Sequence, residues 1–258
     1  MPQYYFNAIA DKGLNLQAIF NIENLPTEIK KSLTFFTKDS HKYNQLVLLG
    51  HGGRQLWREL KAWQSNEKLT PYNLTRLNSA DDPIDSFSAK LTKEYFKGHG
   101  SVSDFKLLFP ILNSSKVVNQ RLKTINFQAL GKLAGWHNDS PIGVGINTQW
   151  GAWFAYRAIV LVKANFRINE YPSAVSPCES CVNKPCLSAC PVSKLNSDLI
   201  EIEHCVEYRV KEASNCKNRC LARLACPVKK EHQYSDEQIN YHYSLSMKMI
   251  EKLNEINC

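Results

Sequence analysis

This sequence of 258 residues has no long hydrophobic run, and its most apolar stretches, such as Ala158 to Val162, are much shorter than the roughly 20 residues of a membrane-spanning helix. Its first residues lack the basic region and the apolar core of a signal peptide. We therefore expect a cytoplasmic protein that makes no contact with a membrane. In a reducing compartment of this kind, cysteines serve as metal ligands more readily than as disulfide partners.

The sequence also lacks a long run of Lys or Arg. The formal net charge is +8, and the whole excess lies in residues 1–177, because residues 178–258 carry eleven basic and eleven acidic side chains. The basic residues are scattered, as in Lys30-Lys31 and Arg121-Leu-Lys123, which is typical of a solvated surface. A nucleic-acid partner is therefore not expected, and a phosphate-bearing ligand has only weak support.

A dinucleotide-binding fingerprint is incomplete. The predicted strand Gln45 to Leu49 runs into Gly50-His-Gly-Gly53 and then into a helix, an order that suits anion binding at a helix start. The fingerprint requires a third glycine where Gln55 stands. We interpret residues 50–53 as a tight connection, with an anion site as the alternative. Three histidines beside glycines or in polar loops are candidate acids or metal ligands, although each fits an ordinary loop position: His51, His99 and His137.

Cysteine, by contrast, is abundant near the C-terminus. Eight of the nine cysteines lie between residues 178 and 226. Cys205 separates two runs that both end in Cys-Pro-Val, as in an imperfect repeat. In two-cluster ferredoxins, the cysteine before proline binds the other cluster. The eight thiols are therefore predicted to hold two 4Fe-4S clusters, one on Cys178, Cys181, Cys186 and Cys226 and the other on Cys190, Cys205, Cys216 and Cys220. The ninth, Cys258, is not expected to be a ligand.

The cysteine spacing departs from the simple bacterial form. Four residues separate Cys181 from Cys186, and five separate Cys220 from Cys226, where two and three are usual. The longer loops remove no ligand. A structural zinc site, built from close cysteine pairs, and a disulfide framework are the alternatives. Neither alternative accounts for the two Cys-Pro endings, so iron-sulfur clusters are the prediction.

Outside the cysteine runs, apolar periodicity predicts an α+β body. Strands are expected at residues 16–22 and 45–49, a short apolar segment at 105–112 and a further strand up to residue 162; helices are expected at 26–33, 54–63, 82–96, 119–134 and 235–257. The predicted domains are a body at residues 1–170, a cysteine module at 171–232 and a C-terminal helix at 233–258 that packs on the body.

A glycine-rich loop and an aromatic strand occupy residues 134–162. Glycines permit close approach of the backbone to a large flat ligand, and aromatic side chains can cover such a ligand. The alternative is a buried β-hairpin whose tryptophans belong to the core. Residue types alone favour this alternative.

The order of these segments resembles epoxyqueuosine reductases, which are cobalamin-dependent and carry two 4Fe-4S clusters. The resemblance rests on Ala134-Gly-Trp, the glycine loop, Trp150-Gly-Ala-Trp-Phe, the first cysteine run, Cys205-Val-Glu-Tyr and the second run, and it covers about residues 119–230. The segment that starts at Trp150 is also similar to cobalamin-processing proteins of the cobalamin-C type. The resemblance implies a nitroreductase-like α+β fold, in which helices flank a mixed sheet, with an appended two-cluster ferredoxin-like module and a C-terminal helix.

The resemblance further implies a corrinoid near four residues of this chain: Trp150, Gly151, Trp153 and Tyr156. Electrons would pass through the clusters to the corrinoid from a donor such as a flavodoxin or ferredoxin reductase. Two family features are missing here, namely a proton-donating Asp, since Asn-Gln-Arg-Leu-Lys surrounds Arg121, and a helical-repeat region that helps bind tRNA. Epoxide reduction needs an acid for the leaving oxygen.

We therefore expect a cobalamin-reducing or cobalamin-dependent oxidoreductase whose activity is not epoxyqueuosine reduction. A ferredoxin-like electron carrier that docks a protein partner and holds no corrinoid is the alternative, which leaves enzymatic activity open. A flavin in place of the corrinoid is a third reading.

Overall fold

The computed structural model describes residues 5–66, 82–111, 125–168, 171, 175–193 and 200–256, without the side chains of residues 35, 36 and 252–256. The chain forms two compact units. Unit 1 comprises Met1–Ala134 and Ala155–Pro172, and unit 2 comprises Gly135–Phe154 and Ser173–Cys258. Unit 2 therefore joins the glycine-rich loop and the C-terminal helix to the cysteine segment, whereas the predicted limits lie at residues 170 and 232.

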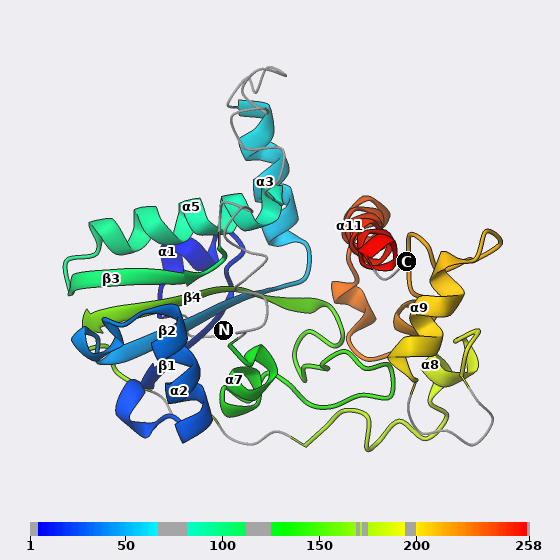
Figure 1. Cartoon of the computed structure of the whole chain (residues 1–258), viewed down its shortest axis with the longest axis horizontal. Coiled ribbons are helices and arrows are strands. Elements are labelled where there is room, and N and C mark those ends of the chain that lie inside the picture. The colour runs from blue at the N-terminus through cyan, green and yellow to red at the C-terminus, as the bar shows by residue number, and fades with distance from the viewer. Residues whose placement is uncertain are drawn as a thin grey trace. The chain divides into compact units, whose positions relative to one another are not determined.

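Unit 1 is built on a four-stranded sheet with the strand order β1-β2-β4-β3 (Figure 1). The strands are β1 (Leu16–Asn21), β2 (Gln45–Gly52), β3 (Val102–Phe109) and β4 (Phe154–Ala164). The pairings β1 with β2 and β3 with β4 are antiparallel, and Leu16 lies opposite Gly50 in the first. Every residue of β2 is buried, as its continuous apolar run suggests. The predicted α+β class is confirmed.

The described helices of unit 1 overlap the predicted periodic segments, except for α1, which was not predicted. They are α1 (Asn7–Ala10), α2 (Thr27–Phe36), α3 (Gln55–Asn66), α5 (Pro83–Gly98) and α7 (Phe127–Leu133), with short 3-10 turns at Ile22–Asn24 and Ser40–Lys42. Helix α5 begins where Asp82 accepts a hydrogen bond from the Ile84 backbone N–H at 3.0 Å, and it runs alongside β3 (Figure 1). The α7 prediction began at residue 119, and residues 119–124 lie outside the described ranges. Gly135, with φ of +68°, follows α7 as predicted.

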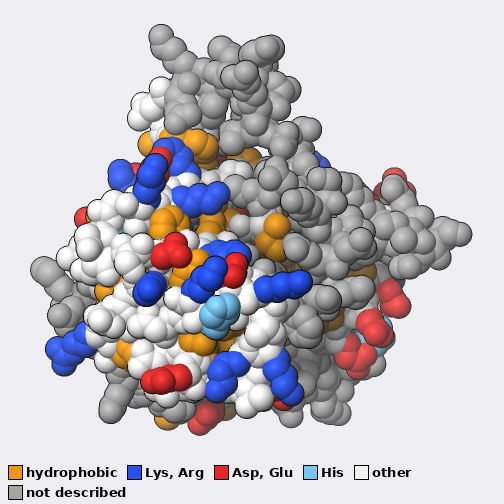
Figure 2. All heavy atoms as spheres, turned by 60° about the vertical axis from the view of Figure 1, so that its left-hand side comes forward, with side chains coloured by type: hydrophobic (Ala, Val, Ile, Leu, Met, Phe, Trp, Pro, Cys, Tyr) orange, Lys and Arg blue, Asp and Glu red, His pale blue; other side chains and the backbone are white. Residues whose placement is uncertain are grey.

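The core of unit 1 lies between the sheet and its helices. Ile19 of β1, Leu48 of β2 and Val160 of β4 are fully buried, and Phe6 packs edge-to-face on Phe96 of α5. Figure 2 shows Lys and Arg side chains spread over the face that it presents, with Asp and Glu side chains among them. Among the described residues, no helix combines the length and apolar character needed to cross a membrane.

Unit 2 contains short helices and one long one. They are α8 (Pro185–Ser188), α9 (Ile202–Val210), α10 (Leu221–Ala225) and α11 (Asp236–Ile256), with a 3-10 turn at Lys230–His232. Ser235 Oγ accepts a hydrogen bond from the Gln238 backbone N–H at 3.2 Å and so caps the start of α11. Trp153, Tyr234 and Ile239 form a buried apolar cluster. Helix α11 contacts α9, and α10 contacts α8.

Candidate metal centre

The first predicted thiol set consists of Cys178, Cys181, Cys186 and Cys226. Its members lie in turns, on the short helix α8 and at the end of α10. Cys178 donates its backbone N–H to Ser176 Oγ, and its carbonyl accepts from the backbone N–H of Cys181. Cys186 lies on α8, and Cys226 ends α10. Cys186 and Cys226 are buried, and the other two thiols are half-buried.

Electrostatic coupling connects Cys226, in the second cysteine run, with the three thiols of this set that lie in the first run. Burial raises the pKa of the Cys178, Cys186 and Cys226 thiols, because desolvation penalises the thiolate. The charge of the distant Cys226 raises the pKa of Cys178 and Cys186 further, and that of Cys181 raises the pKa of Cys226. The two cysteine runs therefore meet at this place in unit 2.

The thiols of the second predicted set, Cys190, Cys205, Cys216 and Cys220, are also coupled electrostatically. Cys205 lies on α9, and Cys220 begins α10, where its Sγ accepts from the Arg223 backbone N–H at 3.4 Å. Burial raises the pKa of Cys205 and Cys216, and the charges of Cys190 and Cys220 raise both further. Each thiol with a shifted pKa thus responds to members of its own predicted set.

The thiols are available for metal binding. None of the eight described cysteines takes part in a disulfide. As placed, no three Cys, His, Asp or Glu side chains within the described ranges converge into a site for a single metal ion. A single zinc ion would draw its four thiolates together at bonds of about 2.3 Å. A cubane is wider, because each of its thiolates binds a different iron at its own corner.

Two arginines in unit 2, the buried Arg209 and the half-buried Arg223, were not singled out from the sequence. Arg209 donates to the carbonyl oxygen of Cys216 at 3.1 Å, and Arg223 donates to that of Ala152 at 3.0 Å. Positive charge on Arg209 lowers the pKa of Cys205 and Cys216 and so opposes the effect of burial. The position of Arg209, one helical turn after Cys205, was the available signal in the sequence.

The four residues expected near a corrinoid have distinct surroundings. In unit 2, Trp153 is only 1% exposed, and the Arg223 guanidinium lies 4.5 Å from its ring centroid. Trp150 is half-buried beside His232, with 4.4 Å between ring centroids. Gly151 has φ of +60°, and a Cβ there would lie 2.2 Å from the carbonyl oxygen of Val228.

Tyr156, the fourth of these residues, belongs to unit 1. Its ring stacks on Phe127 with 5.5 Å between centroids, and burial raises the pKa of its phenol. Gly131 of α7 leaves room for the Tyr156 hydroxyl, which would lie 1.8 Å from an added Cβ. Within their own units, Gly151, Trp153 and Tyr156 thus make close contacts with protein atoms.

The three candidate histidines also have partners. His51 is buried and accepts a hydrogen bond from Arg157 Nε at 3.0 Å. His137 is buried, and its Nε2 lies 3.7 Å from an Asp139 carboxylate oxygen. His99 Nδ1 accepts from the Ser101 backbone N–H at 3.2 Å. These contacts account for each histidine as part of the local structure.

Solved structures with a similar fold provide the comparison. The crystal structure of a B12-trafficking protein CblC from C. elegans, described as a human MMACHC homologue, has a TM-score of 0.50 and 14% identity over 88% of this chain and 84% of that one. Epoxyqueuosine reductase, crystallised with an epoxyqueuosine-modified tRNA-Tyr stem loop, has a TM-score of 0.50 and 12% identity over 91% and 67%. This confirms the expected likeness in fold. No family model and no curated protein sequence matches the chain.

Proposed function

We propose that this chain is an iron-sulfur redox protein that holds two 4Fe-4S clusters and passes electrons to a bound corrinoid. The observation that supports the proposal is that unit 2 holds eight free thiols, and that each thiol with a shifted pKa is coupled to members of its own predicted set. Each predicted set has the donors of one cubane, because four thiolates satisfy its four irons.

The residues of the chain would perform three tasks toward such clusters. The thiols bind iron, and the burial of Cys186, Cys216 and Cys226 keeps water from that side of each site. Arg209 and Arg223 place positive charge beside the ligands. When bound, each cluster would supply storage for one electron at a potential that its surroundings set.

The corrinoid part of the proposal is supported by the two structures with a similar fold. One is the structure of a B12-trafficking protein, and the family resemblance of residues 119–230 includes cobalamin dependence. In the predicted contact set, the half-buried Trp150, like the buried Trp153, has an indole N–H that no atom of the described chain accepts. A hydrogen-bond acceptor on a ligand would satisfy it.

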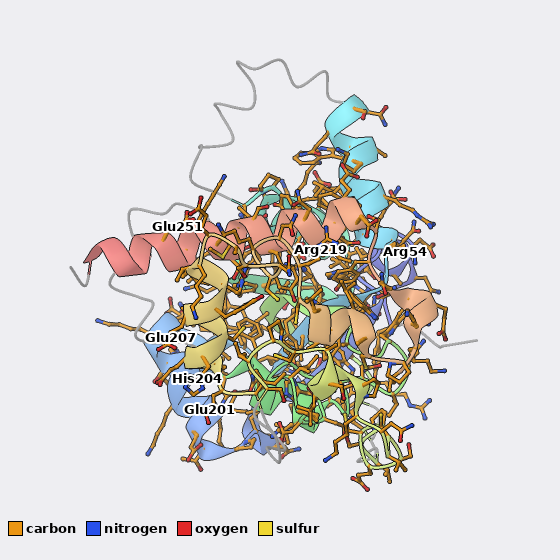
Figure 3. All side chains as sticks on the ribbon, turned by 90° about the vertical axis from the view of Figure 1, so that its right-hand side faces the viewer. Arg54, Glu201, His204, Glu207, Arg219 and Glu251 are labelled. Atoms are coloured by element: carbon orange, nitrogen blue, oxygen red, sulfur yellow. The ribbon has the colours of Figure 1, made fainter. Side chains whose placement is uncertain are left out.

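A second candidate function is electron transfer to a protein partner without a corrinoid. It is favoured by the contacts that engage Trp153 and Gly151 within unit 2. Helix α9 also carries exposed acidic side chains beside Cys205, with Glu201 and Glu207 drawn along it in Figure 3. An acidic surface at a cluster attracts a basic redox partner.

The deciding experiment is anaerobic reconstitution of the full chain with iron and sulfide and an iron count. The protein is then reduced with dithionite, freed of excess dithionite and titrated with hydroxocobalamin. We expect about eight irons per chain, a shifted corrinoid spectrum, and reduction of the cobalt only when iron is present. Eight irons with an unchanged corrinoid spectrum would favour the electron carrier. A flavin spectrum in the purified protein would favour the flavin alternative, and one zinc per thiol set with no acid-labile sulfide would contradict the cluster proposal.

A further inference from the structure

Arg209 is a buried cation in the last turn of α9. It is 7% exposed, although its neighbour Val210 is 41% exposed and Glu207 is also at the surface. Its position, four residues after Cys205, places both side chains on the same side of the helix. The guanidinium is therefore turned into unit 2, toward the second thiol set.

The hydrogen bonds of Arg209 all go to neutral acceptors. Its Nε donates to the carbonyl of Cys216 at 3.1 Å and its Nη1 to Ser246 Oγ at 2.9 Å. Its Nη2 donates to the carbonyls of Lys217 and Tyr243 at 3.2 and 3.1 Å. The planar fork thus connects α9, which carries Cys205, to the loop that carries Cys216 and to α11.

No carboxylate in the described part of the chain pairs with Arg209. Burying a cation without an opposite charge is unfavourable, because the cation loses its hydration. The dipole at the helix C-terminus offsets only a small part of this cost. The Tyr243 ring, 5.2 Å from the guanidinium carbon, offsets a further part by cation–π attraction. An anionic group beside the thiols of Cys205 and Cys216 would supply the remaining countercharge.

We propose that Arg209 is the counter-cation of the cluster on Cys190, Cys205, Cys216 and Cys220, and that it raises the reduction potential of that cluster. The inference rests on the proposed function, because it needs a cluster at this set. Reduction by one electron adds one negative charge beside the guanidinium, and a fixed positive charge stabilises the more negative state.

The test compares midpoint potentials in the full, reconstituted chain. Dithionite supplies electrons under argon, and EPR and visible spectra follow the two clusters as the potential is lowered. Arg209→Met should lower one midpoint by about 59 mV, a tenfold fall in the ratio of reduced to oxidised cluster, and leave the other unchanged. Cys205→Ser assigns the couples, since the couple that it removes should be the one that Arg209→Met shifts.

Two control variants separate charge from structure. Arg209→Lys keeps the charge and loses the fork, so it should lower thermal stability while changing the reduced-to-oxidised ratio less than threefold. Arg219→Gln removes an exposed charge beside Cys220 (Figure 3). Because water screens an exposed charge, the ratio of reduced to oxidised cluster at a given potential should change less than twofold for both clusters. If Arg209→Met loses iron, Arg209→Gln, which retains amide donors, replaces it.

The outcomes are distinct. Two four-iron clusters with unchanged midpoints in Arg209→Met or Arg209→Gln would overturn the inference and leave the proposed function standing. An equal shift in Arg209→Lys would also overturn it, because the charge would then be irrelevant. If Arg209→Lys keeps both clusters while Arg209→Met and Arg209→Gln lose iron, the result would support the inference, because only lysine retains the positive charge. A wild-type chain that binds no clusters overturns the proposed function, and the inference with it.

Discussion

Arg157 Nε donates a hydrogen bond to His51 Nδ1 at 3.0 Å, and both side chains are buried in unit 1. Because Nδ1 accepts this bond, His51 carries its own proton on Nε2. The same guanidinium lies 3.5 Å from an Asp85 carboxylate oxygen, so it connects β2, β4 and α5. His51 was a candidate acid in the sequence, and in the structure it is a hydrogen-bond acceptor within unit 1.

This bond predicts a stability effect. Arg157→Gln should lower the free energy of unfolding by about 2 kcal/mol, because it leaves a buried imidazole nitrogen with a weaker partner and removes the ion pair. Urea unfolding of the purified chain measures the change. Arg58→Gln, an exposed arginine on α3, is the matched control and should stay within about 0.5 kcal/mol. Equal losses in both variants would contradict a specific role for Arg157.

The close approach of the Tyr156 hydroxyl to Gly131 predicts that unit 1 does not tolerate a side-chain methyl group at position 131. Gly131→Ala should destabilise unit 1 by about 2 kcal/mol, since a Cβ would lie 1.8 Å from the phenol oxygen. Adding Tyr156→Phe should restore part of the loss, because the oxygen is removed but the ring carbon remains 2.7 Å from the Cβ. Thermal unfolding of the single and double variants decides this. No recovery in the double variant would mean that another contact determines the cost.

The thiol sets predict which cysteine variants share a phenotype. Cys178→Ser and Cys226→Ser should each remove the same redox couple and reduce iron from about eight to about four per chain. Cys190→Ser should instead match Cys205→Ser, although Cys190 lies in the first sequence run. Iron analysis and EPR of the reconstituted variants measure this. Cys258→Ser, at a position outside the described residues, serves as the control and should retain all the iron.

Alkaline pH should weaken unit 1 through Tyr171. Burial first, and then the Tyr5 hydroxyl 3.2 Å away, raises the pKa of the Tyr171 phenol above its ordinary value of about 10. The folded state therefore binds this proton more tightly than the unfolded state does. Its contribution is fully present below pH 10 and is lost as the pH rises through the folded pKa.

Tyr171→Phe tests this contribution. The variant loses the hydrogen bond from the Ile19 backbone N–H at 2.7 Å, so the free energy of unfolding at neutral pH should fall by about 1 kcal/mol. Its decline in stability above pH 10 should be shallower than that of the wild type. Urea unfolding at several pH values compares the two slopes. Parallel slopes would show that Tyr171 does not titrate differently in the two states.

The two tryptophans of the aromatic segment should separate binding from folding. Trp153→Ala should cost about 3 to 5 kcal/mol, because it empties a fully buried position. Trp150→Ala should cost less and should weaken the spectral response to hydroxocobalamin, as the proposed corrinoid contact requires. Fluorescence unfolding and corrinoid titration measure the two effects. An unchanged titration in Trp150→Ala would remove Trp150 from the contact set.

Local chemistry explains what could be predicted from the sequence. The Asp82-Pro83 start of α5 and the glycine after α7 depend on residues a few positions apart, so pattern alone located them. The grouping of the eight thiols stays a prediction, which rests on cluster stoichiometry and on the two Cys-Pro endings. In the structure, the charge of Cys226 raises the pKa of Cys178, a member of its predicted set.

Tertiary structure decided the features that depend on distant partners. The buried setting of Trp153 requires Arg223 and Tyr234, some 70 and 80 residues away in the chain. Likewise, Arg209 becomes a buried, carboxylate-free cation only because Cys216, Tyr243 and Ser246 surround it. Periodicity indicates which side of a helix is apolar, but the energy of a buried charge depends on atoms that only folding brings within a few ångströms.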